Sequence, residues 1–254
     1  MPTAALYDIH GNLPALDAVL ADLDASGADR VVVGGDVVAG PFPSETLRRL
    51  RDLAVPTYYL RGNAEAEALR AAAGRAPGGL SERADEEARW LAATLSATDL
   101  AFIATWPPTV DLVVPPWGRV LFCHATPGSD SRVFTERTPE AALPPLFEGV
   151  DADLAVCGHT HLPFDRAAGS LRVVNAGSVG MPFGRTGADW LLLGDAVEFR
   201  HTDYDLADAA GRVRRSGYPH ADAFAQRSVE SVPGKAAALA MLAALEEAQS
   251  GEHR

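Results

Sequence analysis

The sequence has no apolar run of about eighteen residues, the length that a membrane-spanning helix requires. The first residues, MPTAALYDIHGN, carry no basic stretch ahead of an apolar one, so we expect no secretory signal peptide. Only two of the 254 residues are cysteines, Cys123 and Cys157, and both lie in apolar runs. We therefore expect two buried free thiols in a reducing cytoplasm, and neither a disulfide nor a metal-bound thiolate.

Positive charge is also scarce. The 22 lysines and arginines are outnumbered by 34 aspartates and glutamates, which gives a net charge of −12. Because affinity for nucleic acid comes largely from neutralised phosphates, this balance disfavours a broad nucleic-acid interface without excluding one. It still allows a single phosphate to be held by local cations. The oligomeric state is not indicated by the sequence.

Short apolar runs alternate with helical patterns through the first two thirds of the chain. Strands are expected within residues 3–10, 29–36, 55–63, 119–127 and 153–161. Asn12 is a candidate N-cap, with Pro14 near the first helical position, for a helix whose apolar face follows. That face comprises Leu16, Val19, Leu20 and Leu23. Further helices are expected from about Asn63, over residues 82–95 and after Pro139.

The pattern changes near residue 170. Residues 171–179 and 189–205 are expected to form strands in a meander, with a turn at Gly194 and Asp195. Helices are expected from Asp205 onward. The last helix is rich in alanine and leucine and either packs on the core or forms a dimer interface. We favour packing on the core.

Without an internal repeat or linker, residues 1–254 are expected to form one α/β domain. Two mixed β-sheets would pack face to face with helices outside, which is an αββα four-layer sandwich. Its metal-site core would span about residues 1–182, and the C-terminal meander and helices about residues 183–254.

A residue able to bind a metal or a phosphate follows each of the five expected strands. These residues are Asp8, His10, Asp36, Asn63, His124, His159 and His161. Strand periodicity would direct Asp8 and His10 to the same face, and ligands of open α/β sheets bind beyond the carboxyl ends of the strands. Mixed nitrogen and oxygen ligands suit Mn²⁺, Fe, Zn²⁺, Co²⁺ or Ni²⁺. Seven side chains exceed one tetrahedral site, but they suffice for two metals if one carboxylate bridges them.

The ordered set DIH, GGD, RGN, CH and GHTH resembles the calcineurin-like metallophosphoesterases over about residues 5–182. The segments YDIHGNLPALDAVL and NAGSVGMPFG resemble in particular their small bacterial and archaeal phosphodiesterase-like branch. The resemblance implies an αββα sandwich and two divalent metal ions, with Mn²⁺ favoured and Mg²⁺ also allowed. It implies that Asp8, His10, Asp36 and His161 hold the first metal. Asp36 would bridge to the second, which Asn63, His124 and His159 would complete.

The expected nucleophile is a metal-bridging water, which attacks phosphorus in line. Many members of the family carry after the Gly-Asn pair a histidine that is thought to protonate the leaving group. Here Ala64 takes that position, and alanine cannot donate a proton. Another donor, an acidic leaving group or slow turnover would each account for the difference. Glu65 is either such a donor, or an orienting carboxylate, or, as we favour, a solvent-facing acid that suits the helix dipole.

Candidate substrate contacts are Asn12, Arg61, Arg132 and Arg185, of which Arg61 is favoured because it adjoins Asn63. Carboxylates would orient the histidines, but the sequence does not identify them. The leading hypothesis is a cytoplasmic phosphodiesterase for a small or nucleotide-like phosphoester, with no membrane partner. A phosphomonoesterase, a dinucleoside polyphosphate hydrolase and a nuclease are alternatives. A non-catalytic scaffold of the same fold is another, as in a retromer subunit that resembles the family but has lost metal ligands.

Overall fold

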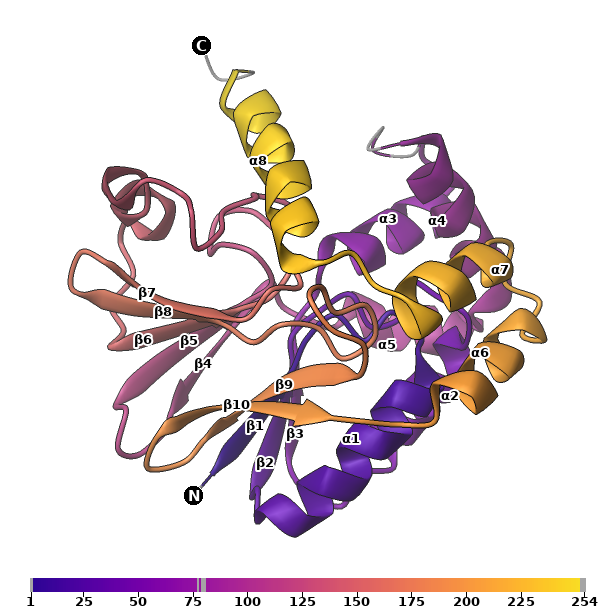
Figure 1. The fold of residues 1–254 in the computed structure, drawn as a ribbon, viewed down its shortest axis with the longest axis horizontal. Coiled ribbons are helices and arrows are strands. Elements are labelled where there is room, and N and C mark those ends of the chain that lie inside the picture. The colour runs from indigo at the N-terminus through magenta and orange to yellow at the C-terminus, as the bar shows by residue number, and fades with distance from the viewer. Residues whose placement is uncertain (1, 77, 79–80, 252–254) are drawn as a thin grey trace.

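A computed structural model describes residues 2–76, 78 and 81–251, and two five-stranded sheets pack face to face in it (Figure 1). The first sheet has the order β10-β9-β1-β2-β3. Its strands are β1 (Thr3–Leu6), β2 (Arg30–Val33), β3 (Thr57–Tyr59), β9 (Ala188–Leu193) and β10 (Val197–Thr202). The second sheet has the order β4-β5-β6-β8-β7. Its strands are β4 (Thr109–Val113), β5 (Arg119–Cys123), β6 (Leu154–Cys157), β7 (Phe164–Ala168) and β8 (Leu171–Asn175).

Both sheets are mixed, as predicted. In the first, β1 pairs in parallel with β2 and β2 with β3, whereas β9 is antiparallel to β1. In the second, β5, β6 and β8 are parallel, and β4 and β7 are antiparallel edge strands. Side chains of the two inner faces, such as Val32 and Leu191 against Phe122 and Val156, share one buried cluster between the sheets. The carboxyl ends of the parallel strands consequently present their loops at a common edge.

Helices of the first half of the chain cover the outer face of the first sheet (Figure 1). They are α1 (Leu13–Ser26), α2 (Pro43–Arg51), α3 (Asn63–Ala72), α4 (Glu82–Thr94) and α5 (Ala97–Ala104). As predicted, Asn12 caps α1 by accepting a hydrogen bond from the Ala15 N–H at 3.3 Å, and Pro14 lies in the first turn. The predicted apolar face of α1 is buried in the core.

The predicted meander is wrong, because its strands divide between the two sheets. Strand β8 forms a hairpin with β7 in the second sheet, whereas β9 and β10 form a hairpin in the first, connected through residues 194–196. Strand β9 lies next to β1, so the C-terminal third completes the sheet that carries the first candidate ligands. The helix expected after Pro139 is also wrong. Two short 3-10 helices, η1 (Glu140–Ala142) and η2 (Pro144–Phe147), occupy that segment, where Pro144 and Pro145 interrupt regular helix.

The C-terminal segment comprises α6 (Leu206–Arg214), α7 (Ala221–Phe224), the π-helix η3 (Ala225–Glu230) and α8 (Lys235–Gly251). On α8, Leu239 and Leu242 are buried against Val133 and Leu162, so one face of the helix packs on the body of the protein as expected. Leu245, on another face of α8, is 48% exposed.

Both cysteines are buried free thiols, as predicted, and burial raises the pKa of the Cys123 thiol to about 12. Within the described residues, no helix combines the length and the apolar character needed to cross a membrane.

Replacing Leu239 with alanine should lower the free energy of unfolding by about 2–3 kcal/mol, because it leaves a cavity under α8. Leu245→Ala on the same helix is the matched control, and we expect its effect to stay within about 0.5 kcal/mol because this side chain is half exposed. Urea denaturation monitored by circular dichroism measures both. Equal effects of the two substitutions would show that α8 does not dock through Leu239.

Candidate metal centre

The residues that the sequence singled out as metal ligands lie just beyond the carboxyl ends of β1, β2, β3, β5 and β6. Six of them form two groups, and in each group the candidate ligand atoms lie within 4.8 Å of one another. The first group is Asp8, His10 and His161, and the second is Asp36, His124 and His159. These groups correspond to the two halves of the expected metal pair.

The backbone at five of the candidate ligands is left-handed. Asp8 and His10 converge on one group, as predicted, but strand periodicity is not the reason, because strand β1 ends at Leu6, before both residues. The φ angles are 53° at Asp8, 49° at His10, 49° at Asp36, 66° at His159 and 55° at His161. In the described part of the chain no other residue except glycine has a positive φ. Such backbone costs on the order of 1–3 kcal/mol per residue and is typical of functional sites.

Three of the four histidines are oriented by backbone carbonyls, not by the carboxylates that we expected. The Nδ1–H of His10 donates to the Ala39 carbonyl at 3.1 Å, and that of His124 donates to Gly34 at 2.9 Å. The His161 Nδ1 makes the equivalent bond to the Met181 carbonyl at 2.9 Å. A carbonyl can only accept, so each Nδ1 carries the proton and each Nε2 presents its lone pair to the centre in the neutral ring.

Acceptor atoms crowd the first group. The buried Asp8 Oδ1 has no hydrogen-bond partner in the described part of the chain, although its Oδ2 accepts from the His159 N–H at 2.8 Å. The Nε2 atoms of His10 and His161 lie 3.2 Å apart, and the His161 Nε2 is 3.3 Å from Asp8 Oδ1. Lone pairs this close require a proton or a cation between them. The mixed nitrogen and oxygen donors therefore fit a divalent transition metal.

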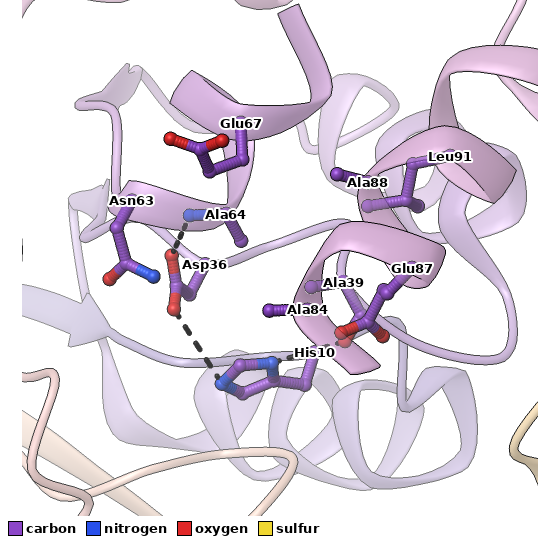
Figure 2. A pocket seen from close by; sticks show the side chains of 10 residues that line it. All are labelled: His10, Asp36, Ala39, Asn63, Ala64, Glu67, Ala84, Glu87, Ala88 and Leu91. Carbon is purple, nitrogen blue, oxygen red and sulfur yellow. Dashed lines mark hydrogen bonds and ion pairs between the residues drawn. The ribbon is translucent and has the colours of Figure 1, made fainter. Parts of the chain in front are cut away.

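Asp36 lies between the two groups. Its Oδ2 is 3.9 Å from the His10 Nε2, and its Oδ1 is 3.5 Å from the His124 Nε2 (Figure 2 shows the contact with His10). One carboxylate thus directs one oxygen to each group, as a bridging ligand must. One end of the Asn63 amide lies 3.2 Å from both the His124 Nε2 and the His159 Nδ1. The NH2 group at this end donates to both nitrogens, and turning the amide by 180° would present its oxygen to a cation in the second group.

The electrostatics of the centre are dominated by burial and by opposite charges. Burial opposes charge on His124, but the carboxylates of Asp36 and Asp8 outweigh it and raise the pKa of His124 to about 10. Burial and the charge of His124 lower the pKa of His159 to about 4. Burial also opposes charge on Asp36, yet His124 holds the pKa of this carboxyl well below its usual range. A cation in the centre would compete with the proton on His124.

Glu65 is fully buried, so the favoured prediction that it faces solvent is wrong. Its Oε2 accepts from the N–H groups of Asp36 at 2.9 Å and Gly62 at 3.0 Å. Its Oε1 accepts from those of Val37 at 2.7 Å and Val38 at 3.2 Å. Burial and then the Asp36 charge raise the pKa of Glu65 to about 7, against these hydrogen bonds. Glu65 therefore ties the loop after β2 to the start of α3.

Two glycines allow the loops to approach the carboxylates. A Cβ at Gly158 would lie 2.4 Å from Asp8 Oδ2, and one at Gly62 would lie 2.3 Å from Asp36 Oδ1. Both distances are far inside van der Waals contact, so any other residue would displace a candidate ligand.

Two pockets adjoin the centre. The α3–α4 pocket, of about 100 Å³, is lined by His10, Asp36, Asn63 and Ala64 together with residues of α3 and α4 (Figure 2). The Arg61 pocket, of about 330 Å³, is lined by residues that include Arg61, His124, Ser129 and Asp130. Arg61 is thus the one predicted arginine that lines a pocket together with a candidate ligand.

The structure places the other predicted substrate contacts elsewhere. Asn12 is fully buried, and its amide donates to the Gly180 carbonyl at 2.9 Å, so it has no exposed surface for a substrate. Arg132 lines a cavity beside the end of α8 and donates to Ser250 at 3.2 Å. Arg185 donates to Asp189 at 3.1 Å. The acid three residues after Gly62 is the sequence signal that could have identified Glu65, because a side chain there reaches back to the N-cap N–H.

We expect Glu65→Ala to lower the free energy of unfolding by about 3 kcal/mol or more, because four buried N–H donors lose their acceptor. The matched control is Glu82→Ala, which removes an exposed acid from the first turn of α4 and should cost at most about 1 kcal/mol. Denaturant titration of both variants measures the two losses in the free energy of unfolding. A loss for Glu65→Ala no larger than the control would contradict the positioning role.

Known proteins resemble this chain in sequence and in fold. The sequence profile described as the calcineurin-like phosphoesterase superfamily domain matches residues 1–194. Phosphodiesterase YfcE of Escherichia coli strain K12 is 28% identical over 203 residues, which cover 75% of this chain and 85% of YfcE.

Two solved structures show the same fold. A metallophosphoesterase from Sphaerobacter thermophilus matches with a TM-score of 0.71 at 23% identity, over 94% of this chain and 99% of that protein. Hypothetical protein PH1004 from Pyrococcus horikoshii OT3 matches with a TM-score of 0.75 at 17% identity, over 88% and 97% of the two chains. With the profile covering three quarters of its length, the chain belongs to the calcineurin-like phosphoesterase superfamily and is a metal-dependent phosphoesterase.

Proposed function

We propose that the protein is a dinuclear metal-dependent phosphodiesterase that acts on a small or nucleotide-like substrate. The observation that carries the proposal is the position of Asp36, which directs one carboxylate oxygen to each of two groups of candidate ligands. Paired metals bridged by a carboxylate are a common solution for phosphoester hydrolysis. The similarity to a relative named as a phosphodiesterase favours a diester substrate.

The residues of each group would have defined roles. Asp8, His10, Asp36 and His161 would hold the first cation, and Asp36, Asn63, His124 and His159 the second. When bound, the cations supply a water that ionises near neutral pH and offset charge on the phosphoryl oxygens. The backbone carbonyls at Gly34, Ala39 and Met181 keep the imidazole rings in the tautomer that can bind metal.

The phosphate would be held by several fixed groups. Helices α1 and α3 begin directly after the candidate ligands of β1 and at Asn63, so two helix N-termini lie at the centre and favour an anion. Arg61 supplies a cation in the neighbouring pocket. Glu65 contributes by positioning the Asp36 loop and is not proposed as a proton donor, because all its hydrogen bonds are to backbone N–H groups.

Mn²⁺ is the metal that we favour, and Fe, Zn²⁺, Co²⁺, Ni²⁺ or Mg²⁺ would fit the same donors. We also propose that the protein acts in the cytoplasm, which two buried free thiols support. The net charge of −12 favours a small substrate over a nucleic acid.

The first test compares hydrolysis of bis(p-nitrophenyl) phosphate and p-nitrophenyl phosphate by metal-stripped protein with and without Mn²⁺. We expect Mn²⁺-dependent cleavage, a higher kcat/KM for the diester, and a loss of at least about 100-fold in His124→Ala. His220→Ala removes a histidine outside both groups and should leave activity unchanged.

Preference for the monoester would instead identify a phosphatase or a dinucleoside polyphosphate hydrolase. Preference for single-stranded DNA or RNA over these small esters would identify a nuclease. No turnover with any divalent metal, together with no metal bound at equilibrium dialysis, would leave the scaffold role.

A second test concerns Ala64, whose methyl group lines the α3–α4 pocket (Figure 2). Without an acid at this position, we expect kcat to fall steeply as the pKa of the leaving alcohol rises. Ala64→His should flatten that dependence and raise kcat for alkyl leaving groups by about 100-fold. The measurement is kcat for a series of substituted phenyl and alkyl diesters. The slope of log kcat against the pKa of the leaving alcohol is then compared between the wild-type protein and Ala64→His. Equal slopes would show that position 64 does not serve the leaving group.

A further inference from the structure

The α3–α4 pocket meets the metal centre at His10 and Asp36 and is otherwise bounded by Ala39 and by the two helices (Figure 2). Part of its wall is apolar. Ala84, Ala88 and Leu91 of α4 line it, and this spacing places one face of the helix toward the pocket. A group bound there would contact mainly carbon atoms. The volume of about 100 Å³ corresponds to roughly three water molecules in the liquid, so the pocket can hold the end of a substrate arm but not a whole arm.

Two carboxylates also line this pocket, Glu67 from α3 and Glu87 from α4, and none of the described residues that line it is a lysine or arginine. The Tyr218 hydroxyl donates to Glu87 Oε1, and the Gly78 N–H donates to Glu67 Oε2 at 2.6 Å. Within the described residues, the hydrogen bonds to each carboxylate therefore fall on one oxygen. Arg70 is 3.7 Å from Glu67, but its side chain is 46% exposed, so solvent weakens this ion pair.

The Arg61 pocket differs in both size and charge. It is about three times larger, at 330 Å³ against 100 Å³, and it presents a guanidinium, hydroxyl groups and the Asp130 carboxylate. Polar groups suit the Arg61 pocket, whereas the α3–α4 pocket offers methyl groups and negative charge. A phosphodiester has two arms, so a phosphate at the metal centre can place a different arm on each side.

Resting on the proposed function, we propose that the α3–α4 pocket receives the quaternary ammonium end of a short ester arm. Methyl groups of the cation would pack on the alanines, and Glu67 and Glu87 would attract its charge as specificity-determining residues. The same carboxylates repel an arm that carries a carboxylate or a further phosphate. The substrate would be an asymmetric diester, with its larger polar arm in the Arg61 pocket.

The test uses three methylphosphonate esters, which carry the single negative charge of a diester but differ in one arm. The arms are choline, its neutral carbon isostere 3,3-dimethylbutyl alcohol, and the anionic 2-carboxyethyl alcohol. Calorimetry with the Mn²⁺-loaded protein gives their dissociation constants, and inhibition of bis(p-nitrophenyl) phosphate hydrolysis gives a second measure. We expect the choline ester to bind about tenfold more tightly than the isostere, and the carboxyethyl ester about tenfold more weakly.

Glu67→Gln/Glu87→Gln removes both charges and keeps the hydrogen-bonding shape, so it should bring the three affinities to within about threefold of one another. Glu86→Gln is the matched control, because Glu86 lies on the same helix and pairs with His220 outside the pocket lining. This control should keep the wild-type order. Circular dichroism checks that both variants are folded.

Equal affinities for the choline and dimethylbutyl esters in the wild-type protein, or an order unchanged in the double variant, would overturn the proposal. Failure of the proposed function has a different signature. In that case no diester is hydrolysed with any metal, and the calorimetric order alone still decides whether the pocket selects a cation.

Discussion

The centre depends on a backbone constraint, namely that five candidate ligands are held in left-handed conformations that their side chains disfavour. Several short-range interactions hold them there. Glu65 fixes the N–H groups of the loop around Asp36, and the Gly35 and Gly62 region tolerates contacts that a Cβ would forbid. Carbonyls of two loops fix the histidine rings: Gly34 and Ala39 lie in the loop after β2, and Met181 lies between β8 and β9. The sheets supply a rigid base, and the loops at their carboxyl ends carry the strain.

Burial of the ionisable groups adds a second cost. Asp8 and Asp36 are almost completely buried, and Asp8 Oδ1 has no partner among the described residues. Isolated buried carboxylates are strongly unfavourable, so the imidazoles that face them are needed for the fold as well as for ligation. The Nε2 atoms of His10 and His161 lie 3.2 Å apart, so their lone pairs repel one another in the neutral rings. A cation between them would turn both lone pairs into favourable metal ligands. We therefore expect a bound metal to stabilise the folded chain.

Much of the fold could be predicted because its signals are local. The continuous apolar runs of β1, β2, β5 and β6 identify strands buried on both faces, and Asn12 with Pro14 identifies the start of α1. The partnership of the later strands could not be predicted. Residues 171–175 and 188–193 have similar patterns, yet they lie in different sheets. A short apolar run identifies a segment as a strand, whereas its pairing depends on which edge of which sheet remains open.

At the site, the sequence by itself determined which side chains carry the chemistry, because each follows a strand signal and the order of strands brings their ends together. The tertiary structure decided the rest. It showed that Asp36 faces both groups, that carbonyls from distant loops orient the rings, and that Glu65 is buried. It also set the opposite character of the two pockets, whose walls come from separate helices and loops. The physical reason is that ligand identity is a property of single residues, whereas orientation, burial and pocket shape are properties of contacts between segments far apart in the chain.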